Sequence, residues 1–255
     1  SQVARTWKYA IKYRAVDENY RFEKMGHHHL PQLMDLAKRS FADESVTLGT
    51  GVTIDNCRNG MEYVFAYAIA ANAVTNISDV CYDTKTNMPI GFRMIDPYYR
   101  DPKTAPFSVT EPTLSEKEAT FFNLLDGALS KIWERFPDEN VVVKPTLLYV
   151  DRLHRKNGLY QVWIDYGVDF PALAKQTGAN VYASMCTSRK TKGWREKLGY
   201  ELVYTSGAHV TNVRGETVPL PEGEIRLYAT DMKTTTAINV KPCWEMMKAC
   251  GMMTK

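Results

Sequence analysis

Hydrophobic and polar positions alternate along the chain in two patterns, one typical of strands and one of helices. Short apolar runs bounded by turns predict strands, and apolar residues that recur every three or four positions predict helices. Strands are expected at 78–83, 89–95, 141–150, 180–185 and 224–231. Helices are expected at 30–41, 61–73, 114–136 and 159–177, with a further one that ends on Lys197–Tyr200. This mixture predicts an α/β (α+β) fold.

Both ends of the chain leave alternatives open. Trp7 to Ala15 and Tyr20 to Met25 each have an extended pattern, and the sequence does not decide which is the first strand. The chain contains no repeat and no low-complexity segment. We therefore interpret 20–232 as one domain, 1–19 as an extension and 233–255 as a tail. The tail's apolar residues fit either packing on the domain or contact with another subunit.

Two connections carry specific expectations. Pro145 has no N–H to donate, so the strand at 141–150 is expected to be irregular there. Pro97 to Pro112 is rich in proline and aromatic residues and is expected to be a loop, either a plain surface connection or an aromatic lip over a pocket. Ser115 and Glu118 form a capping-box pattern that predicts the start of the helix after this loop.

Composition and charge narrow the class of protein. A net charge of +3 is too small to favour nucleic acid or an anionic membrane as the main partner. The longest apolar run, Val64 to Ala71, is too short to span a bilayer. The five cysteines are odd in number and lack CxxC spacing, so we interpret them as free thiols in a reducing cytoplasm. We interpret His27–His29 as a solvated helix start and assign no metal site.

The stretch from Thr146 to Tyr200 contains the most specific chemistry. An apolar strand leads into a basic turn, Arg152 to Gly158, and a helix follows it. A helix start with free N–H groups beside such a turn is suited to binding an anion. The common phosphate motifs GxGxxG and GxxxxGK[ST] do not fit, because the turn has the form Arg-x-x-Gly-x-Tyr.

This stretch resembles the acetyl-CoA-binding core of the GNAT N-acetyltransferases, and most closely their arylalkylamine (dopamine-type) branch. Arg155 and Gly158 match the family's Gln/Arg-x-x-Gly-x-Gly/Ala loop. The segment GANVYASMCTSRKTKGWREKLGYELVY, residues 178–204, is similar to the branch's Gly-x-Asn-Val-Tyr…Cys-Ser-Ser…Glu-Lys-Leu-Gly-Phe segment. The resemblance extends over 20–230 and implies a twisted, mostly antiparallel mixed sheet flanked by helices.

The resemblance also implies a site. The strand would hold the pantetheine arm of acetyl-CoA and the turn its pyrophosphate. The expected cofactor-binding residues are Leu148, Tyr149, Val150, Arg155, Lys156, Asn157, Gly158, Leu159, Tyr160 and Ser188. Outside this context, Arg155 and Lys156 would be ordinary exposed cations. Tyr160 and Gln161 depart from the small residues of the family loop.

The resembling branch uses the glutamate of Phe-x-x-Asp-Glu-Pro-Leu as a general base through ordered water. Glu44 occupies this position, although Ser45-Val46 replaces Pro-Leu. At pH 7 an alkylamine of pKa near 10 pays about 4 kcal/mol to present its free base, so a nearby carboxylate assists the attack. Thr187, Ser188 and Thr191 retain the hydroxyls of the branch's Cys-Ser-Ser-x-x-Ser run, and one of the first two is expected to cap the next helix.

The expected function is direct transfer of acetyl from acetyl-CoA to a primary amine, with Glu44, Thr187 and Thr191 as the catalytic residues. A small arylalkylamine is the preferred acceptor. The alternatives are a polyamine, an amino acid, a sugar amine, or a catalytically silent CoA-binding protein. Cys186 is a weaker candidate nucleophile, because no histidine lies near it in sequence. The expected partners are small molecules, with the chain a monomer or homodimer.

Overall fold

The computed structural model describes residues 16, 18–156, 158–160, 163 and 168–233 of the 255-residue chain. Within these residues, no helix combines the length and apolar composition that crossing a bilayer requires. Cys57, Cys81 and Cys186 are buried free thiols, as predicted. Cys243, Cys250, the stretch Trp7 to Ala15 and most of the tail lie outside the described residues.

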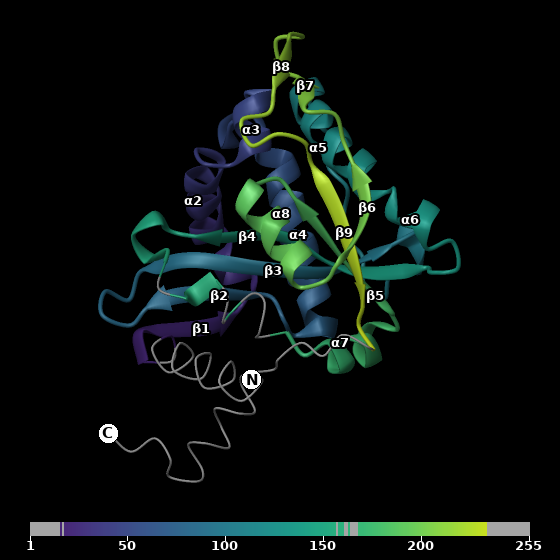
Figure 1. Cartoon of the computed structure of the whole chain (residues 1–255). Coiled ribbons are helices and arrows are strands. Elements are labelled where there is room, and N and C mark those ends of the chain that lie inside the picture. The colour runs from purple at the N-terminus through teal and green to yellow at the C-terminus, as the bar shows by residue number, and fades with distance from the viewer. Residues whose placement is uncertain (1–15, 17, 157, 161–162, 164–167, 234–255) are drawn as a thin grey trace.

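A seven-stranded sheet forms the centre of the molecule (Figure 1). Its order is β1 (Tyr20–Lys24), β2 (Asp79–Asp83), β3 (Pro89–Tyr99), β4 (Val141–Val150), β5 (Val181–Cys186), β9 (Arg226–Asp231) and β6 (Glu201–Thr205). All neighbouring strands are antiparallel except β4 and β5, which are parallel. This sheet confirms the predicted fold class, and Tyr20–Lys24 is its first strand.

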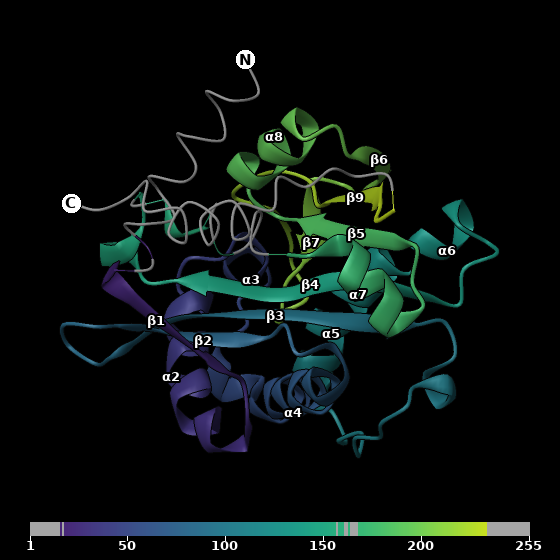
Figure 2. The same cartoon turned by 90° about the horizontal axis from the view of Figure 1, so that it is seen from below.

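Helices cover both faces of the sheet (Figure 2). Their bounds are α2 (Leu30–Phe41), α3 (Ser45–Thr50), α4 (Arg58–Thr75), α5 (Glu116–Leu129), α6 (Ile132–Arg135), α7 (Phe170–Thr177) and α8 (Arg189–Lys197). The largest core cluster joins α2 and α4 to one face of β3 through residues such as Leu36, Phe65 and Phe92. A second cluster joins α7 to β5 through Phe170 and Tyr182. Because strand side chains alternate in direction, each strand contributes to both layers.

A small hairpin lies in the segment predicted only as a polar turn region. It consists of β7 (His209–Thr211) and β8 (Thr217–Pro219), and it lies beside α3 at the top of Figure 1. The Val213 N–H donates to the Thr50 carbonyl oxygen at 2.8 Å, which joins the hairpin turn to the end of α3.

Two predicted helices are shorter than expected. The helix expected at 114–136 begins at its Ser115–Glu118 capping box as predicted, but it ends at Leu129 before the short α6 begins. The prediction of a single helix over 159–177 is wrong, because α7 begins only at Phe170. Asp169 caps α7 by accepting the Ala172 N–H at 3.0 Å. The sequence Asp-Phe-Pro is a helix-start signal that the long apolar pattern concealed.

The loop expected from Pro97 was also placed too early, because β3 continues to Tyr99. Pro97 pairs with Val143 of β4, whereas β2 pairs with β3 only as far as Arg93. Pro97 therefore lies where the strand has a neighbour on one side only, a position at which a missing N–H is tolerated.

The irregularity predicted at Pro145 is present. The register between β3 and β4 shifts between Met94 and Ile95, so that Pro145 pairs with Ile95, Leu147 pairs with Met94, and Thr146 is the extra residue of a bulge. Such a bulge bends a strand and re-aims the side chains around it.

Candidate functional site

The two parallel strands at the middle of the sheet stay paired over a very short length. Val143 and Tyr182 are the only partners in register between β4 and β5 among the described residues. Beyond that pair the strands separate toward their carboxyl ends (Figure 2). We call this opening the fork.

Burial along β4 follows the fork. Val142, Val143, Tyr149 and Val150 are buried, as expected in a central strand, but every residue from Lys144 to Leu148 is half-buried. The β5-facing edge of this stretch has no strand partner among the described residues. Backbone groups on such an edge are free to bind an extended ligand.

Glu44 lies at the amino end of α3 and acts as its cap. One carboxylate oxygen, Oε2, accepts the N–H groups of Val46 at 2.8 Å and Thr47 at 2.9 Å. Caps of this kind satisfy N–H groups that have no partner inside the helix. The cap fixes the orientation of the carboxyl group while leaving its other oxygen for chemistry.

The other oxygen of Glu44, Oε1, is buried and accepts no hydrogen bond among the described residues. Burial raises the pKa of the Glu44 carboxyl, and the nearby Thr187 side chain and the α3 backbone N–H groups oppose this rise. A carboxyl of raised pKa is a stronger base once it is ionised. The structure thus brings Glu44 and Thr187, which are far apart in the sequence, close together.

The three predicted hydroxyl residues divide between two roles. Ser188 caps α8, accepting the Thr191 N–H at 3.2 Å, which is the capping role expected for one of them. The Ser188 and Thr191 hydroxyls lie 2.9 Å apart, and the Thr191 hydroxyl also donates to the Ser188 carbonyl oxygen at 3.0 Å. Thr187 is therefore the member of this set that faces Glu44.

A loop that the sequence did not single out joins these elements. The Glu222 N–H donates to the Ser45 hydroxyl at 3.1 Å, and the Glu222 carboxylate accepts the Arg189 N–H at 3.1 Å. The Lys192 amine also donates to the Glu222 carbonyl oxygen at 2.9 Å. The start of α3, which carries Glu44, is thereby held to the start of α8, which follows Thr187.

The basic turn after β4 is held by ion pairs to the end of α2. Asp43 pairs with both Arg152 and Arg155, and Arg39 pairs with Asp151 at 2.6 Å. The Arg155 guanidinium also donates to the Val150 carbonyl oxygen at 2.7 Å. The Arg155 side chain thus braces the turn, in which Arg152, Arg155 and Lys156 are all exposed.

The turn backbone has an unusual conformation. Lys156 and Gly158 have φ angles of 72° and 80°, in the left-handed region that residues other than glycine rarely adopt. Left-handed residues in a turn direct successive N–H groups toward a common point, a geometry suited to anions. Asn157, the predicted residue between them, lies outside the described residues, as does Gln161.

The beginning of the next helix is packed onto the sheet. Leu159 is buried and Tyr160 packs against the same apolar cluster, which also contains Tyr20 and Val150. Arg93 donates to the Trp163 carbonyl oxygen at 2.5 Å and pairs with buried Asp79, which also accepts the Trp163 indole N–H. The Tyr160 side chain thus contributes to the packing that holds the residues after the turn on the sheet.

Cys186 does not have the environment of a nucleophile. Its thiol is buried, and burial raises its pKa even though the Arg195 guanidinium opposes the rise. The thiol is therefore protonated at neutral pH, and a thiol is a far weaker nucleophile than a thiolate.

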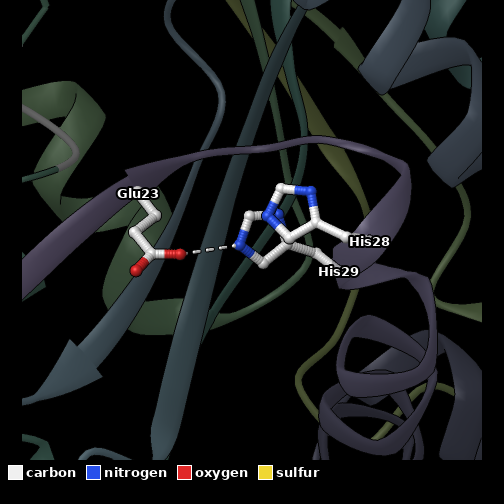
Figure 3. Close-up of side chains that lie close together, drawn as sticks. All are labelled: Glu23, His28 and His29. Atoms are coloured by element: carbon white, nitrogen blue, oxygen red, sulfur yellow. Dashed lines mark hydrogen bonds and ion pairs between the residues drawn. The ribbon is translucent and has the colours of Figure 1, made fainter.

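The predicted histidine run begins a helix, as expected, but His29 is buried (Figure 3). Its Nε2 lies 3.2 Å from a Glu23 carboxylate oxygen, and its ring lies against that of His28, with centroids 3.8 Å apart and the planes tilted by 40°. The ligand atoms of Glu23, His28 and His29 lie close enough to hold a metal ion. However, His29 Nδ1 accepts the Gly26 N–H at 3.1 Å, which places the ring proton on Nε2, where a metal would have to bind. This geometry favours a hydrogen-bonded histidine over a ligand.

Comparison with known proteins gives the fold a family context. No protein-family model matches the chain, and no curated protein matches its sequence. Among solved structures, a mosquito arylalkylamine N-acetyltransferase like 5b is similar, with a TM-score of 0.62 and 19% identity over 83% of this chain and 99% of that one. The Drosophila melanogaster polyamine N-acetyltransferase that forms N-acetylagmatine is also similar, with a TM-score of 0.57 and 14% identity over 84% of this chain and 100% of that one.

A third similar structure has another chemistry. It is the C-terminal condensation domain of Ebony in complex with β-alanyl-dopamine, with a TM-score of 0.61 and 12% identity over 83% of this chain and 98% of that one. These likenesses confirm the predicted GNAT acetyltransferase fold.

Proposed function

We propose that this protein transfers an acetyl group from acetyl-CoA to a small primary amine. The observation that carries the proposal is the meeting of Glu44 and Thr187, because it supplies a buried, oriented base with one oxygen free. The fork beside it supplies free backbone for an extended ligand. The similarity to amine N-acetyltransferases supports the same conclusion.

The residues at the fork fit acetyl-CoA. Leu148, Tyr149 and Val150 pair with β3 but have no partner in β5 among the described residues, so backbone groups on their β5-facing edge would bind the pantetheine arm. The pyrophosphate would bind at the turn, where the left-handed φ angles of Lys156 and Gly158 and the exposed cations support an anion site. On α8, the indole N–H of Trp194 is buried without an acceptor among the described residues, and a buried donor of this kind calls for a ligand oxygen.

Bound acetyl-CoA supplies an activated thioester whose acyl carbon a free amine attacks directly. Glu44 takes the proton from the attacking amine, directly or through one water, using Oε1. Backbone N–H groups of the β4 stretch are placed to stabilise negative charge on the carbonyl oxygen. The Thr187 side chain lowers the pKa of the Glu44 carboxyl from the value that burial alone would give.

We further propose an arylalkylamine as the acceptor. Aromatic contacts fold the loop after β3 onto α4. The ring of Phe107 packs edge-on against that of Tyr67, with ring centroids 5.1 Å apart, and its centroid lies 6.3 Å from that of Tyr99. The Tyr67 hydroxyl donates to the Pro97 carbonyl oxygen at 2.9 Å. These contacts support the aromatic-lip interpretation of the loop. An aromatic wall favours aryl groups and, through cation–π attraction, ammonium groups.

The main alternative acceptor is a polyamine, which the similarity to the N-acetylagmatine-forming enzyme supports. The alternative of a catalytically silent protein predicts cofactor binding without turnover. The proposed setting for the activity is a reducing cytoplasm, consistent with the free thiols.

The test combines binding and turnover. Acetyl-CoA at a hundred times its dissociation constant should stabilise the fold by about 2.7 kcal/mol, a measurable rise in melting temperature. Thiol release should then be measured with arylalkylamines, polyamines, amino acids and amino sugars. Release with arylalkylamines supports the full proposal, and release only with another class replaces the acceptor. Binding without release supports the silent alternative, and no melting shift at millimolar acetyl-CoA contradicts the proposal.

A further inference from the structure

A lysine occupies an unusual place at the centre of the sheet. Lys144 directly follows Val143, the last residue of β4 in register with β5, so it lies at the closed end of the fork. Its side chain is half-buried, although the two residues before it in the strand are buried. Lysine is rare in the middle of a sheet, because removing its charge from water is costly.

The surroundings of Lys144 are built from polar and aromatic groups. Its amine donates to the hydroxyl of Thr146, the extra residue of the β4 bulge. Its nitrogen lies 5.9 Å from the centre of the Tyr98 ring. Partial removal from water lowers the pKa of the Lys144 amine, while the charges of Asp96 and Asp126 oppose this fall. A larger share of this amine is therefore uncharged than in a solvated lysine.

Asp96 faces Lys144 from the neighbouring strand. The two residues are direct partners in the β3–β4 register, and Asp96 is fully buried. Neither of its carboxylate oxygens makes a hydrogen bond within 3.5 Å among the described residues. Burial raises the pKa of Asp96, which Lys144 and Thr146 partly counteract. A buried carboxyl without hydrogen bonds is an uncommon arrangement and a ready acceptor for a proton.

We propose that Lys144 is a self-acetylation site, whose amine takes an acetyl group from the acetyl-CoA held in the fork. This inference rests on the proposed function, which places the thioester beside the β4 bulge. The step requires an amine of lowered pKa at the closed end of the fork and a proton acceptor that faces it. Lysine side chains with lowered pKa values are the ones that serve as nucleophiles in proteins.

The chemistry balances without another reactant. The nitrogen lone pair of Lys144 attacks the acyl carbon, a carbon–nitrogen bond forms, and the carbon–sulfur bond breaks with its electrons leaving on the CoA thiolate. The proton released from nitrogen passes to the Asp96 carboxylate. The product is an amide, which does not pass its acetyl group on to an amine. Acetylation therefore fills the closed end of the fork and removes a charge there, which lowers turnover of the amine acceptor.

The test uses the full chain and deuterated acetyl-CoA with no amine acceptor. Proteolysis and mass spectrometry follow the deuterated acetyl group on each lysine over time. The exposed residues Lys103 and Lys117 report uncatalysed acetylation. We expect Lys144 to be labelled about tenfold faster or more, because its amine is held beside the bound thioester and is uncharged more often than an exposed lysine. A non-reactive CoA analogue should suppress labelling at Lys144 only.

A second readout does not depend on acetyl-CoA. Labelling of the unliganded chain with a small acetylating ester across a pH series gives the titration of each lysine. Lys144 should become reactive at lower pH than Lys103. Asp96→Asn removes the proton acceptor and should slow acetyl-CoA-dependent labelling of Lys144, even though losing the Asp96 charge lowers the pKa of the amine further. Asp126→Asn removes only a charge that raises this pKa, so it should not slow the labelling.

The outcomes separate this inference from the proposed function. If acetyl-CoA raises the melting temperature and an amine is acetylated, but Lys144 is labelled no faster than Lys103, self-acetylation is overturned and the proposed function stands. If acetyl-CoA gives no melting shift, both fall. Should Asp96→Asn fail to fold, the labelling of the unaltered chain still decides.

Discussion

Two adjacent carboxyl groups at the end of α2 have opposite environments. Asp43 belongs to a surface ion-pair cluster with Arg152 and Arg155, and its hydrogen bond from Arg152 lowers its pKa. Glu44 is turned inward as the cap of α3, and burial raises its pKa. Two consecutive residues thus differ in their roles. The Asp43 carboxylate braces the fold, and the Glu44 carboxylate is suited to accept a proton.

The difference shows how the site is assembled. The Asp43 cluster holds the basic turn after β4 against α2, which sets the position of Lys156 and Gly158. The Glu44 cap fixes the base relative to α8, with the Glu222 loop as the link. Under the proposed function, cofactor positioning and proton removal would depend on neighbouring residues through separate contacts, and substitutions should separate the two.

The largest effect is expected from Glu44→Gln. Glutamine keeps an oxygen that can accept the α3 N–H groups, but it cannot accept the amine's proton. Turnover should fall by about 10²–10⁴-fold while acetyl-CoA binding is retained. Part of the loss should return at high pH, where free amine is more abundant. Steady-state kinetics beside melting shifts with acetyl-CoA would measure both properties.

The stability of this variant provides an internal control. The pKa of Glu44 is raised in the folded chain, so its ionisation costs stability as pH rises through that pKa. Glu44→Gln removes this cost and should be at least as stable as the parent at neutral pH. A melting temperature well below that of the parent would show that Glu44 is structural.

The next largest effect concerns the turn. Gly158→Val places a branched side chain at a φ of 80°, beside the backbone expected to approach phosphate. It should lose the stabilisation of about 2.7 kcal/mol that saturating acetyl-CoA provides at a hundred times its dissociation constant. Gly178→Val is the matched control, because Gly178 has a φ of 73° and nothing within 4 Å of an added Cβ.

Both glycine variants carry the same kind of backbone strain, so both should melt lower than the parent without ligand. Only Gly158→Val should lose the acetyl-CoA shift. If the two variants respond equally to acetyl-CoA, the pyrophosphate lies elsewhere.

A smaller effect is expected from Thr187→Val, which keeps the side-chain shape and removes the hydroxyl. Because the Thr187 hydroxyl lowers the pKa of Glu44, its loss should raise that pKa further. The acidic limb of the pH–rate profile should move to higher pH. Ser188→Ala, which removes the α8 cap, should reduce stability and leave the limb in place. Identical limbs for Thr187→Val and the parent would show that the hydroxyl does not interact with the base.

The smallest effect is expected from Asp43→Asn. The folded-state pKa of Asp43 is depressed below its ordinary value of 3.8, so its contribution to stability is present above that pH and disappears as pH falls through the folded pKa. The variant should be slightly less stable than the parent at pH 7 and equal to it in strong acid. Exposed ion pairs contribute little, so turnover should change little. Denaturant midpoints at several pH values would measure the difference.

The sequence predicted the elements and their order well, because strand and helix periods are local properties. The register irregularity at Pro145 was predictable from a missing N–H, and the capping boundary at Ser115 from its partner Glu118. The break before α7 was missed because the apolar pattern of 159–177 outweighed the Asp169 cap. Residue identity at that boundary was more informative than periodicity.

The site was predictable only where a motif resembled a known family. Glu44 and Thr187 were each named as candidates that way, but their contact with each other and the contacts of Glu222 depend on tertiary structure that no local pattern encodes. Lys144 did leave a signal, since a lysine interrupts an otherwise apolar strand. Its partner Asp96 is known only from the β3–β4 register, which the sequence does not specify.

The most direct test of the account is the pH dependence of kcat/KM for the parent and Glu44→Gln with the best amine. The account predicts that the parent loses activity toward acid as a single group is protonated, with an apparent pKa above the ordinary glutamate value of 4.5. Glu44→Gln should lack this limb and follow only the ionisation of the amine. The same acidic limb in both proteins would contradict the assignment of Glu44 as the base.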